Sequence, residues 1–159
     1  MLKDLGLSYC VPYRTEFSSD GSVDLIVSRS VLEHIVPEIL ETMVADFRRI
    51  LGPNGGMVHF IDCSDHFAMH DKSISRCNFL RYEEWVWRFC CINNYQNRLR
   101  HSDYVAMLRR HGFTISYDWR ESREKEQREV AAMPLASQFV GRDIEDLAAI
   151  SSHFVAIAP

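Results

Sequence analysis

The first third of the chain alternates short apolar runs with a stretch of helical periodicity. Residues 23–27 are mostly apolar, and their length and flanks are typical of a strand buried on both faces of a parallel sheet. Residues 57–61 repeat that pattern. Between them, Pro37 favours the first turn of a helix, and apolar positions then recur at helical spacing: Ile39, Leu40, Met43, Val44, Phe47, Ile50 and Leu51. A strand, a helix and a strand in this order predict a parallel crossover unit.

Polar and aromatic segments follow the second of these strands. Residues 62–78 are polar and predict a loop or short helices at the carboxyl end of the strand. Residues 82–92 predict a helix that carries Trp85, Phe89 and Ile92 on one side. This part of the chain therefore lies where an open sheet usually binds its ligands.

The C-terminal third predicts a helix and two strands. Residues 102–111 form the helix, and residues 113–119 alternate apolar and polar positions as a strand does. Residues 120–129 carry mixed charges and predict a solvated linker or helix. Residues 154–158 predict the last strand of the chain.

Composition narrows the class of protein. The 159 residues, 47% of them hydrophobic and 25% charged, are enough for one globular domain. A net charge of −4 gives no reason to expect nucleic acid as a partner, and no apolar run approaches the roughly 18 residues of a membrane span. The five cysteines include no C-x-x-C pair. We therefore expect reduced thiols in a cytoplasmic protein that binds no membrane.

Three stretches together resemble a known family. Residues 23–34, VDLIVSRSVLEH, are similar to the fourth strand and following turn of the class I S-adenosylmethionine-dependent methyltransferases. Residues 48–56, RRILGPNGG, resemble the R-x-L-K-P-G-G turn before the fifth strand of that family. Residues 108–113, LRRHGF, resemble its late L-x-x-x-G-F helix exit. Their order and spacing indicate the C-terminal part of such a methyltransferase.

The resemblance implies an α/β fold class. We expect a partial Rossmann-like methyltransferase sheet, mostly parallel, with an antiparallel strand near the C-terminus and helices packed on it. Residues 1–159 form a single domain on this interpretation. Its parts are a remnant of an upstream strand and loop at 1–20, a strand-helix-strand core at 21–62, acceptor-side loops and helices at 63–111, and C-terminal strands at 112–159.

The sequence also departs from the family pattern. It contains no G-x-G-x-G loop, which in the family lets the backbone approach S-adenosylmethionine. Nor does it offer a candidate for the acidic residue that binds the ribose hydroxyls. Residues 9–13 are what we expect to remain of the third strand, and Asn54 adds a residue to the turn before the fifth, where we expect a bulge. We therefore expect weak or no cofactor binding by this chain alone.

The resemblance places cofactor contacts directly after the fourth strand. It implies that Ser28, Arg29, Ser30 and Leu32 line the methionine end of S-adenosylmethionine, and that His34 lies at the substrate mouth. Ligands of open sheets bind beyond the carboxyl ends of the strands, which agrees with this placement. The alternative is that residues 31–32 pack in the core while Glu33 and His34 face water.

Residues after the fifth strand are the candidates for chemistry on the acceptor. Methyl transfer depends mainly on alignment of the nucleophile with an activated donor, and a general base helps only when the acceptor carries a proton. Asp62 and His66 are the predicted catalytic residues, although Asp62 could be a turn residue and His66 a solvated one. Arg98 and Arg100 are predicted to bind an anionic acceptor, with a solvated basic face as the alternative.

The histidine spacing after the second strand does not predict a metal site. His66 and His70 would share one face of a helix, and acidic residues lie nearby at positions 62, 65 and 71. An H-x-x-x-H spacing alone is a common accident, however, and no helix is assured at this point.

Two functions remain open from the sequence. The first is a methyltransferase that acts on a small-molecule or glycan-type acceptor and is inactive in this truncated form. The second is a non-catalytic fragment or interaction module that self-associates, most simply as a homodimer. Residues 23–27 would lack their usual neighbouring strand, and an apolar strand with a free edge invites pairing with another chain. The rival arrangement is that residues 9–13 fold back onto that edge, although Pro12 cannot donate a ladder hydrogen bond.

Overall fold

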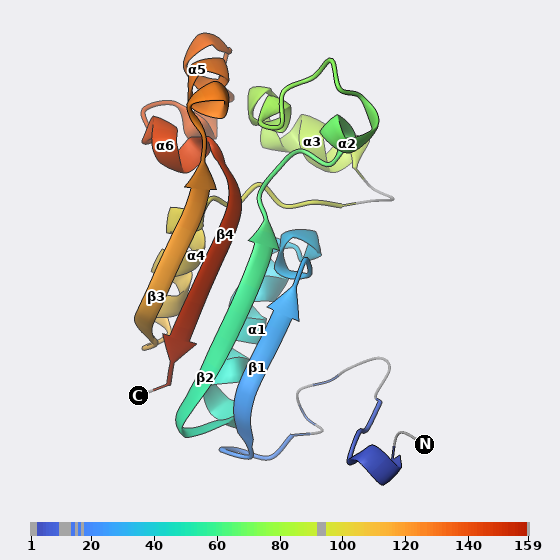
Figure 1. The fold of residues 1–159 in the computed structure, drawn as a ribbon, viewed down its shortest axis with the longest axis vertical. Helices are drawn as coiled ribbons and strands as arrows, with labels where there is room; N and C mark the ends of the chain where they lie inside the picture. Colours follow the sequence, from blue (N-terminus) through green and yellow to red (C-terminus); the bar gives the residue numbers. More distant parts are fainter. Residues whose placement is uncertain (1–2, 10–13, 15, 17, 92–94, 159) are drawn as a thin grey trace.

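A computed structural model describes residues 3–9, 14, 16, 18–91 and 95–158 (Figure 1). Its four strands form one sheet in the order β1-β2-β4-β3. In chain order they are β1 (Val23–Arg29), β2 (Leu51–Asp62), β3 (Thr114–Ser122) and β4 (Ala149–Ile157). β1 pairs parallel with β2, whereas β4 pairs antiparallel with both β2 and β3. Three described strands therefore run one way and β4 opposes them, which confirms the predicted α/β sheet.

The strand-helix-strand unit is confirmed. Helix α1 (Pro37–Ile50) connects β1 to β2 and begins at Pro37, as predicted. Its buried side chains follow one face of the helix, and Leu40 is fully buried there. Ile39, which was predicted to lie on that apolar face, is exposed instead because it points away from the sheet.

The extra residue in the turn after α1 does produce a bulge. Val23 pairs with Leu51 and Leu25 pairs with Gly56, so one residue of β1 faces four of β2. Asn54 adopts a φ of 63°, a left-handed conformation that asparagine tolerates better than most residues. A Cβ added at Gly55 would lie 2.9 Å from the carbonyl oxygen of Gly52, so the tight turn has no room for a side chain.

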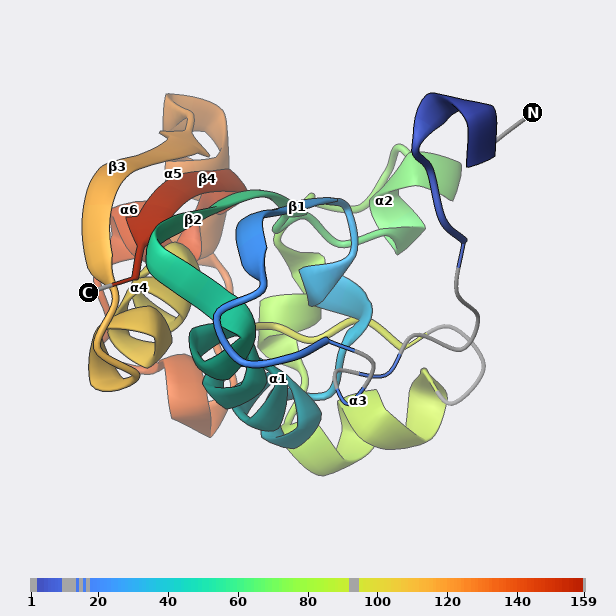
Figure 2. The same cartoon turned by 90° about the horizontal axis from the view of Figure 1, so that it is seen from below.

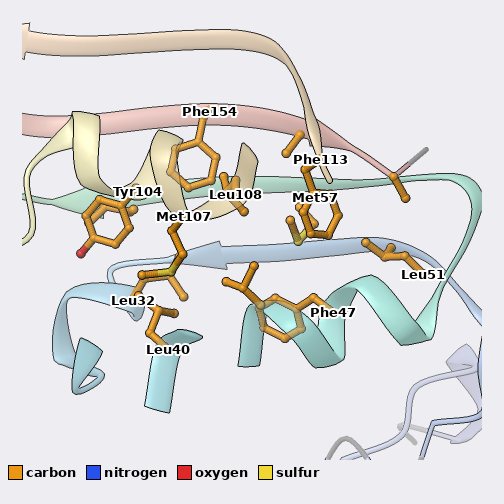
Figure 3. Close-up of a cluster of buried hydrophobic side chains, with 14 of the residues drawn as sticks. Leu32, Leu40, Phe47, Leu51, Met57, Tyr104, Met107, Leu108, Phe113 and Phe154 are labelled. Carbon is orange, nitrogen blue, oxygen red and sulfur yellow. The ribbon is translucent and has the colours of Figure 1, made fainter. Parts of the chain in front are cut away.

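The main hydrophobic core lies between the sheet and two helices on one of its faces. Figure 2 shows α1 and α4 (His101–Arg110) side by side on that face, and the two helices contact each other. Figure 3 shows Phe47 of α1 and Met107 of α4 pointing into the same cluster. Met57 from β2 and Phe154 from β4 complete it from the sheet. Burial of this cluster gives the hydrophobic stabilisation that holds the helices on the sheet.

The prediction that residues 23–27 are buried on both faces is wrong. Leu25 and Val27 are 56% and 60% exposed, because α1 and α4 cover the other face of the sheet. The strand register places further apolar side chains on the same open face. Phe60, His153 and Trp119 form a row across three strands there, with neighbouring ring centroids 4.8 Å apart. An apolar face of this kind is typical of a surface that another element or chain covers.

A second hydrophobic cluster lies beyond the carboxyl ends of β1 and β2 (Figure 1). It is built from the short helices α3 (Glu84–Cys90), α5 (Glu124–Ala132) and α6 (Ile144–Leu147) and the segments around them. The charged residues 120–129, predicted as a solvated linker or helix, form the end of β3 and the first part of α5. This cluster holds the segment that follows β2 in place beyond the edge of the sheet.

Helix α3 buries a different side from the one predicted. Trp85 and Phe89 share a face, but they are 75% and 76% exposed. Trp87 is the buried aromatic residue, and its Nε1 donates to the carbonyl oxygen of Gln96 at 2.7 Å. Ile92 and residues 10–13 of the predicted remnant strand 9–13 lie outside the described residues. No described helix is long and apolar enough to cross a bilayer.

Candidate functional site

The carboxyl ends of β1 and β2 meet at one edge of the sheet. Directly after β1, Ser30 adopts a φ of 52°, and its backbone N–H donates to the carbonyl oxygen of Phe60 at 2.8 Å. A short 3-10 helix, Leu32–His34, follows. Asn97 secures this segment, because its side-chain nitrogen donates to the carbonyl oxygens of Leu32 and Ile35 at 2.7 and 2.9 Å. The two strand ends are therefore held at a fixed separation.

Three of the predicted site residues come together at this edge. The rings of His34 and His66 have centroids 5.1 Å apart, and His66 Nε2 lies 3.7 Å from Asp62 Oδ2. The other carboxylate oxygen of Asp62 accepts from the backbone N–H and the hydroxyl of Ser64, at 2.9 and 2.6 Å. These bonds orient the carboxylate so that its free oxygen faces His66. Asp62 is thus a turn residue and a site residue at once.

Glu33 is the member of this group that the sequence interpretation missed. It was named from the sequence only in the alternative in which it faces water, yet it is only 1% exposed. Neither of its carboxylate oxygens has a hydrogen-bond partner of normal geometry. Burial raises the pKa of the carboxyl, and the nearby backbone N–H groups of Glu33 and Asp62 oppose that shift in part. One ligand atom each from Glu33, His34 and His66 lies within 4.8 Å of the others. The Leu-Glu-His sequence was visible, but the burial of its glutamate depends on the fold.

His66 is partly buried at this edge of the sheet. Its Nε2 is buried without a hydrogen-bond partner. Burial lowers the pKa of His66, and the nearby Asp62 carboxylate opposes that shift. His34 is oriented differently, because its Nδ1 lies 3.0 Å from the carbonyl oxygen of Tyr95. That contact favours the tautomer with a proton on Nδ1 and a free lone pair on Nε2.

The four predicted cofactor residues do not act as one group. Arg29 and Ser30 line a hollow of about 410 Å³ on the open face of the sheet, together with Asp62 and Arg76. Ser28 faces the helix layer instead, with its hydroxyl 2.6 Å from Nδ1 of the buried His59. Leu32 is buried in the main core. We therefore retain only Arg29 and Ser30 as candidates for cofactor contact.

A second hollow adjoins the first at Asp62. Its volume is about 310 Å³, and Asp62 and Arg76 line both spaces. Ser64, Asp65 and Lys72 are among its other lining residues. A single carboxylate, on Asp62, therefore faces two adjoining spaces at the carboxyl end of β2.

The structure corrects the predicted role of Arg98 and Arg100 in acceptor binding. Arg100 is fully buried, and its guanidinium donates to the carbonyl oxygens of Cys63, Leu147 and Ala149 at 2.8, 3.1 and 3.2 Å. Arg98 is also buried, and it pairs with Glu84 at 2.5 Å. Arg100 ties the second cluster to the sheet, whereas Arg98 binds the carbonyl oxygens of Phe79 and Tyr82 within that cluster. Both guanidinium groups are buried, so neither faces solvent where an anionic acceptor would bind.

Cys63 and Cys77 do not supply a nucleophile to this edge. Cys63 and Cys77 are buried thiols, and burial raises their pKa values to about 12 and about 11. A thiol with so high a pKa is protonated at neutral pH and unreactive. This agrees with the interpretation of these two residues as structural thiols.

Several solved structures that share this fold are methyltransferases. A methyltransferase from Methanosarcina mazei superposes with a TM-score of 0.52 and 14% sequence identity, covering 89% of this chain and 61% of that chain. The methyltransferase in a complex with the Haloferax volcanii Trm112 activator gives 0.50 and 17%, covering 89% and 57%. The chain has the fold of the class I S-adenosylmethionine-dependent methyltransferases. Its four strands and two core helices form part of that fold.

A third neighbour of this methyltransferase fold has ligands bound. It is the geranyl diphosphate C-methyltransferase from Streptomyces coelicolor, in complex with Mg²⁺, geranyl diphosphate and S-adenosyl-L-homocysteine, with a TM-score of 0.51 and 11% identity, covering 89% of this chain and 50% of that chain. The chain thus spans between half and about three fifths of the length of these three neighbours. The sequence matches no protein-family model and no curated protein.

Proposed function

We propose that this chain supplies the acceptor side of an S-adenosylmethionine-dependent methyltransferase that acts on a small-molecule or glycan-type acceptor. One observation carries the proposal. In a methyltransferase fold, Asp62 ends β2 and lines two adjoining hollows at the edge where such sheets bind their ligands. The first hollow would receive the reacting end of the cofactor, and the second would receive the acceptor.

The residues present fit one end of the cofactor. Arg29 and Ser30 line the first hollow beside Asp62 and would contact the methionine end. The printed sequence contains no glycine-rich loop to approach the remainder of the molecule. When bound, S-adenosylmethionine supplies a sulfonium methyl group that is already activated for transfer. The protein therefore contributes mainly alignment of the acceptor with that methyl group.

Asp62 would contact the acceptor directly. Its Oδ2 is free of the turn bonds that hold Oδ1, so it can accept a hydrogen bond from an acceptor hydroxyl or amine and take up its proton. Nε2 of His66 lies 3.7 Å from this oxygen. His66 is therefore a positioning residue that acts through Asp62. His34 contacts His66 from the end of β1 and connects the two strand ends.

Cofactor contact is tested by an NMR titration of the chain with S-adenosylhomocysteine. We expect shift changes centred on Arg29, Ser30 and Asp62. We also expect a dissociation constant weaker than that of a complete site by roughly 100-fold, because about three hydrogen bonds of about 1 kcal/mol each are missing. Shift changes elsewhere, or none at millimolar ligand, would contradict the proposal. A micromolar dissociation constant would contradict the expected weak binding, but it would support the assignment of this hollow as a cofactor site.

Acceptor chemistry is tested by Asp62→Asn in a form of the protein that turns over. We expect kcat to fall by about 100-fold or more, as for loss of a general base, with little change in cofactor affinity. Asp71→Asn is the matched control, because Asp71 holds Ser73 in the same kind of turn at 2.9 and 2.7 Å but is exposed. His66→Ala should raise KM and lower kcat less than Asp62→Asn does. Equal activity of Asp62→Asn and Asp71→Asn would remove Asp62 from the acceptor site.

A further inference from the structure

The group formed by Glu33, His34 and His66 has the composition of a metal site. Its three side chains come from the ends of β1 and β2, and their ligand atoms lie within 4.8 Å of one another. Two imidazoles and one carboxylate form a donor set that binds divalent transition metals such as Zn²⁺. By contrast, His70, four residues after His66, is exposed and lies outside this group.

The buried carboxylate is the second observation that points to a ligand. Glu33 is 1% exposed, and both of its oxygens lack a hydrogen-bond partner. An unpaired buried carboxylate costs several kcal/mol, and buried charges in proteins are normally paired or bound to a metal. Nε2 of His66 is also buried and without a hydrogen-bond partner. Two donor groups that lack partners at the same point would both gain one from a single cation.

The surroundings of the three side chains match those of metal ligands. His34 Nδ1 lies 3.0 Å from the carbonyl oxygen of Tyr95, and a metal-bound histidine usually makes such a bond with its second ring nitrogen. Asp62 Oδ2 lies 3.7 Å from His66 Nε2 and can become a fourth ligand. Ligands of a tetrahedral Zn²⁺ lie roughly 3.4 Å apart, given bonds of about 2.1 Å. Small rotations of the three side chains would therefore bring their ligand atoms to the separation that a cation requires.

We propose that Glu33, His34 and His66 bind one divalent transition-metal ion of the zinc class. The ion lies next to Asp62, whose Oδ2 is 3.7 Å from His66 Nε2. Binding itself does not rest on the proposed methyl transfer and is measured without cofactor or acceptor. If that transfer also occurs, the ion would lower the pKa of an acceptor hydroxyl held beside Asp62, as bound zinc does for water.

The test is titration of the whole chain with Co²⁺ alone, followed by visible absorption and by calorimetry. We expect one ion per chain, with at least roughly tenfold weaker binding in Glu33→Gln and in His66→Ala, since even residues around metal ligands contribute that much. His70→Ala is the matched control and should bind as the unaltered chain does. Equal binding by Glu33→Gln, loss of binding in His70→Ala, or absence of binding would overturn the proposal.

Two further measurements keep the proposal testable if a variant folds poorly. Bound Co²⁺ should broaden the ring signals of His34 and His66 in the unaltered chain and leave those of His111 sharp, because His111 follows the C-terminus of α4 and pairs with Glu41 instead. Broadening of His111 in place of the other two would contradict the assignment. A thiolate-to-cobalt charge-transfer band would likewise overturn it, because it would place the ion on a cysteine.

Discussion

Replacing Arg100 by methionine tests whether this arginine serves the fold or a ligand. The guanidinium is fully buried, and it donates to the carbonyl oxygens of Cys63, Leu147 and Ala149. Methionine has a similar length and no donors, so Arg100→Met leaves those three buried carbonyl groups without this partner. If Arg100 were an anion ligand at the surface, the same change would cost little stability.

The size of the effect follows from those three bonds. Hydrogen bonds to a charged group contribute about 1.5–3 kcal/mol each, which gives a gross loss of about 5–9 kcal/mol. The variant regains part of this, because a buried guanidinium carries a desolvation penalty of several kcal/mol that methionine does not. We therefore expect a net loss of about 3–5 kcal/mol in the free energy of unfolding, a large part of the 5–15 kcal/mol that is usual for a domain.

Urea denaturation followed by tryptophan fluorescence and circular dichroism measures this loss. With an m-value of about 2 kcal/mol/M, a loss of about 4 kcal/mol lowers the midpoint by about 2 M. Arg109→Met is the control on helix α4, which follows Arg100, because Arg109 is exposed, and it should change stability by less than about 0.5 kcal/mol. Arg100→Lys keeps the charge but loses the fork of donors, so its stability should lie between the two.

A loss of less than about 1 kcal/mol in Arg100→Met would refute this reasoning. A loss of affinity for phosphate or sulfate at unchanged stability would go further, because it would restore Arg100 as an anion ligand. Such a result would mean that the three carbonyl groups find other partners in the variant, and that their bonds to the guanidinium contribute little.

Two other predictions concern pH and association. Burial lowers the pKa of His59 to about 4 from an ordinary value of about 6.5. The neutral ring therefore contributes its whole share of the free energy of unfolding above a pH of about 6.5. That contribution, up to about 3 kcal/mol, is lost as the pH falls towards 4. In urea denaturation across that range, His59→Gln should show a smaller dependence on pH, and an equal slope would contradict this. Sedimentation equilibrium at micromolar concentration should show a homodimer that Val27→Lys, on the open face, dissociates and Ile39→Lys, exposed on α1, does not. An 18.5 kDa monomer in the unaltered chain would contradict the predicted association.

The positions of β1, of β2 and of helix α1 between them could be predicted from the sequence. Alternation and helical periodicity depend on neighbours a few residues away, so Pro37 and the apolar face of α1 could be identified locally. The same holds for the bulge at Asn54, because one residue added to a short turn must be accommodated there. The residues after each strand were also identifiable as a site, since parallel strands end at one edge.

The burial of polar residues was decided by the tertiary structure. Glu33 and Arg100 have charged side chains that sequence patterns assign to the surface. Each is buried because segments distant in the sequence close over it. Arg100 meets carbonyl groups at positions 63, 147 and 149, and Glu33 lies beside His66 from the other strand. No local pattern records such meetings.

The open face of the sheet was decided in the same way. Leu25 and Val27 have the composition of a core strand, and the sequence alone determined that they would be apolar and extended. Whether an apolar strand is covered on one face or on two depends on where the helices pack, and here α1 and α4 lie on the same face. Periodicity specifies which side chains share a face of a strand, whereas only the packing of distant elements determines whether that face meets protein or water.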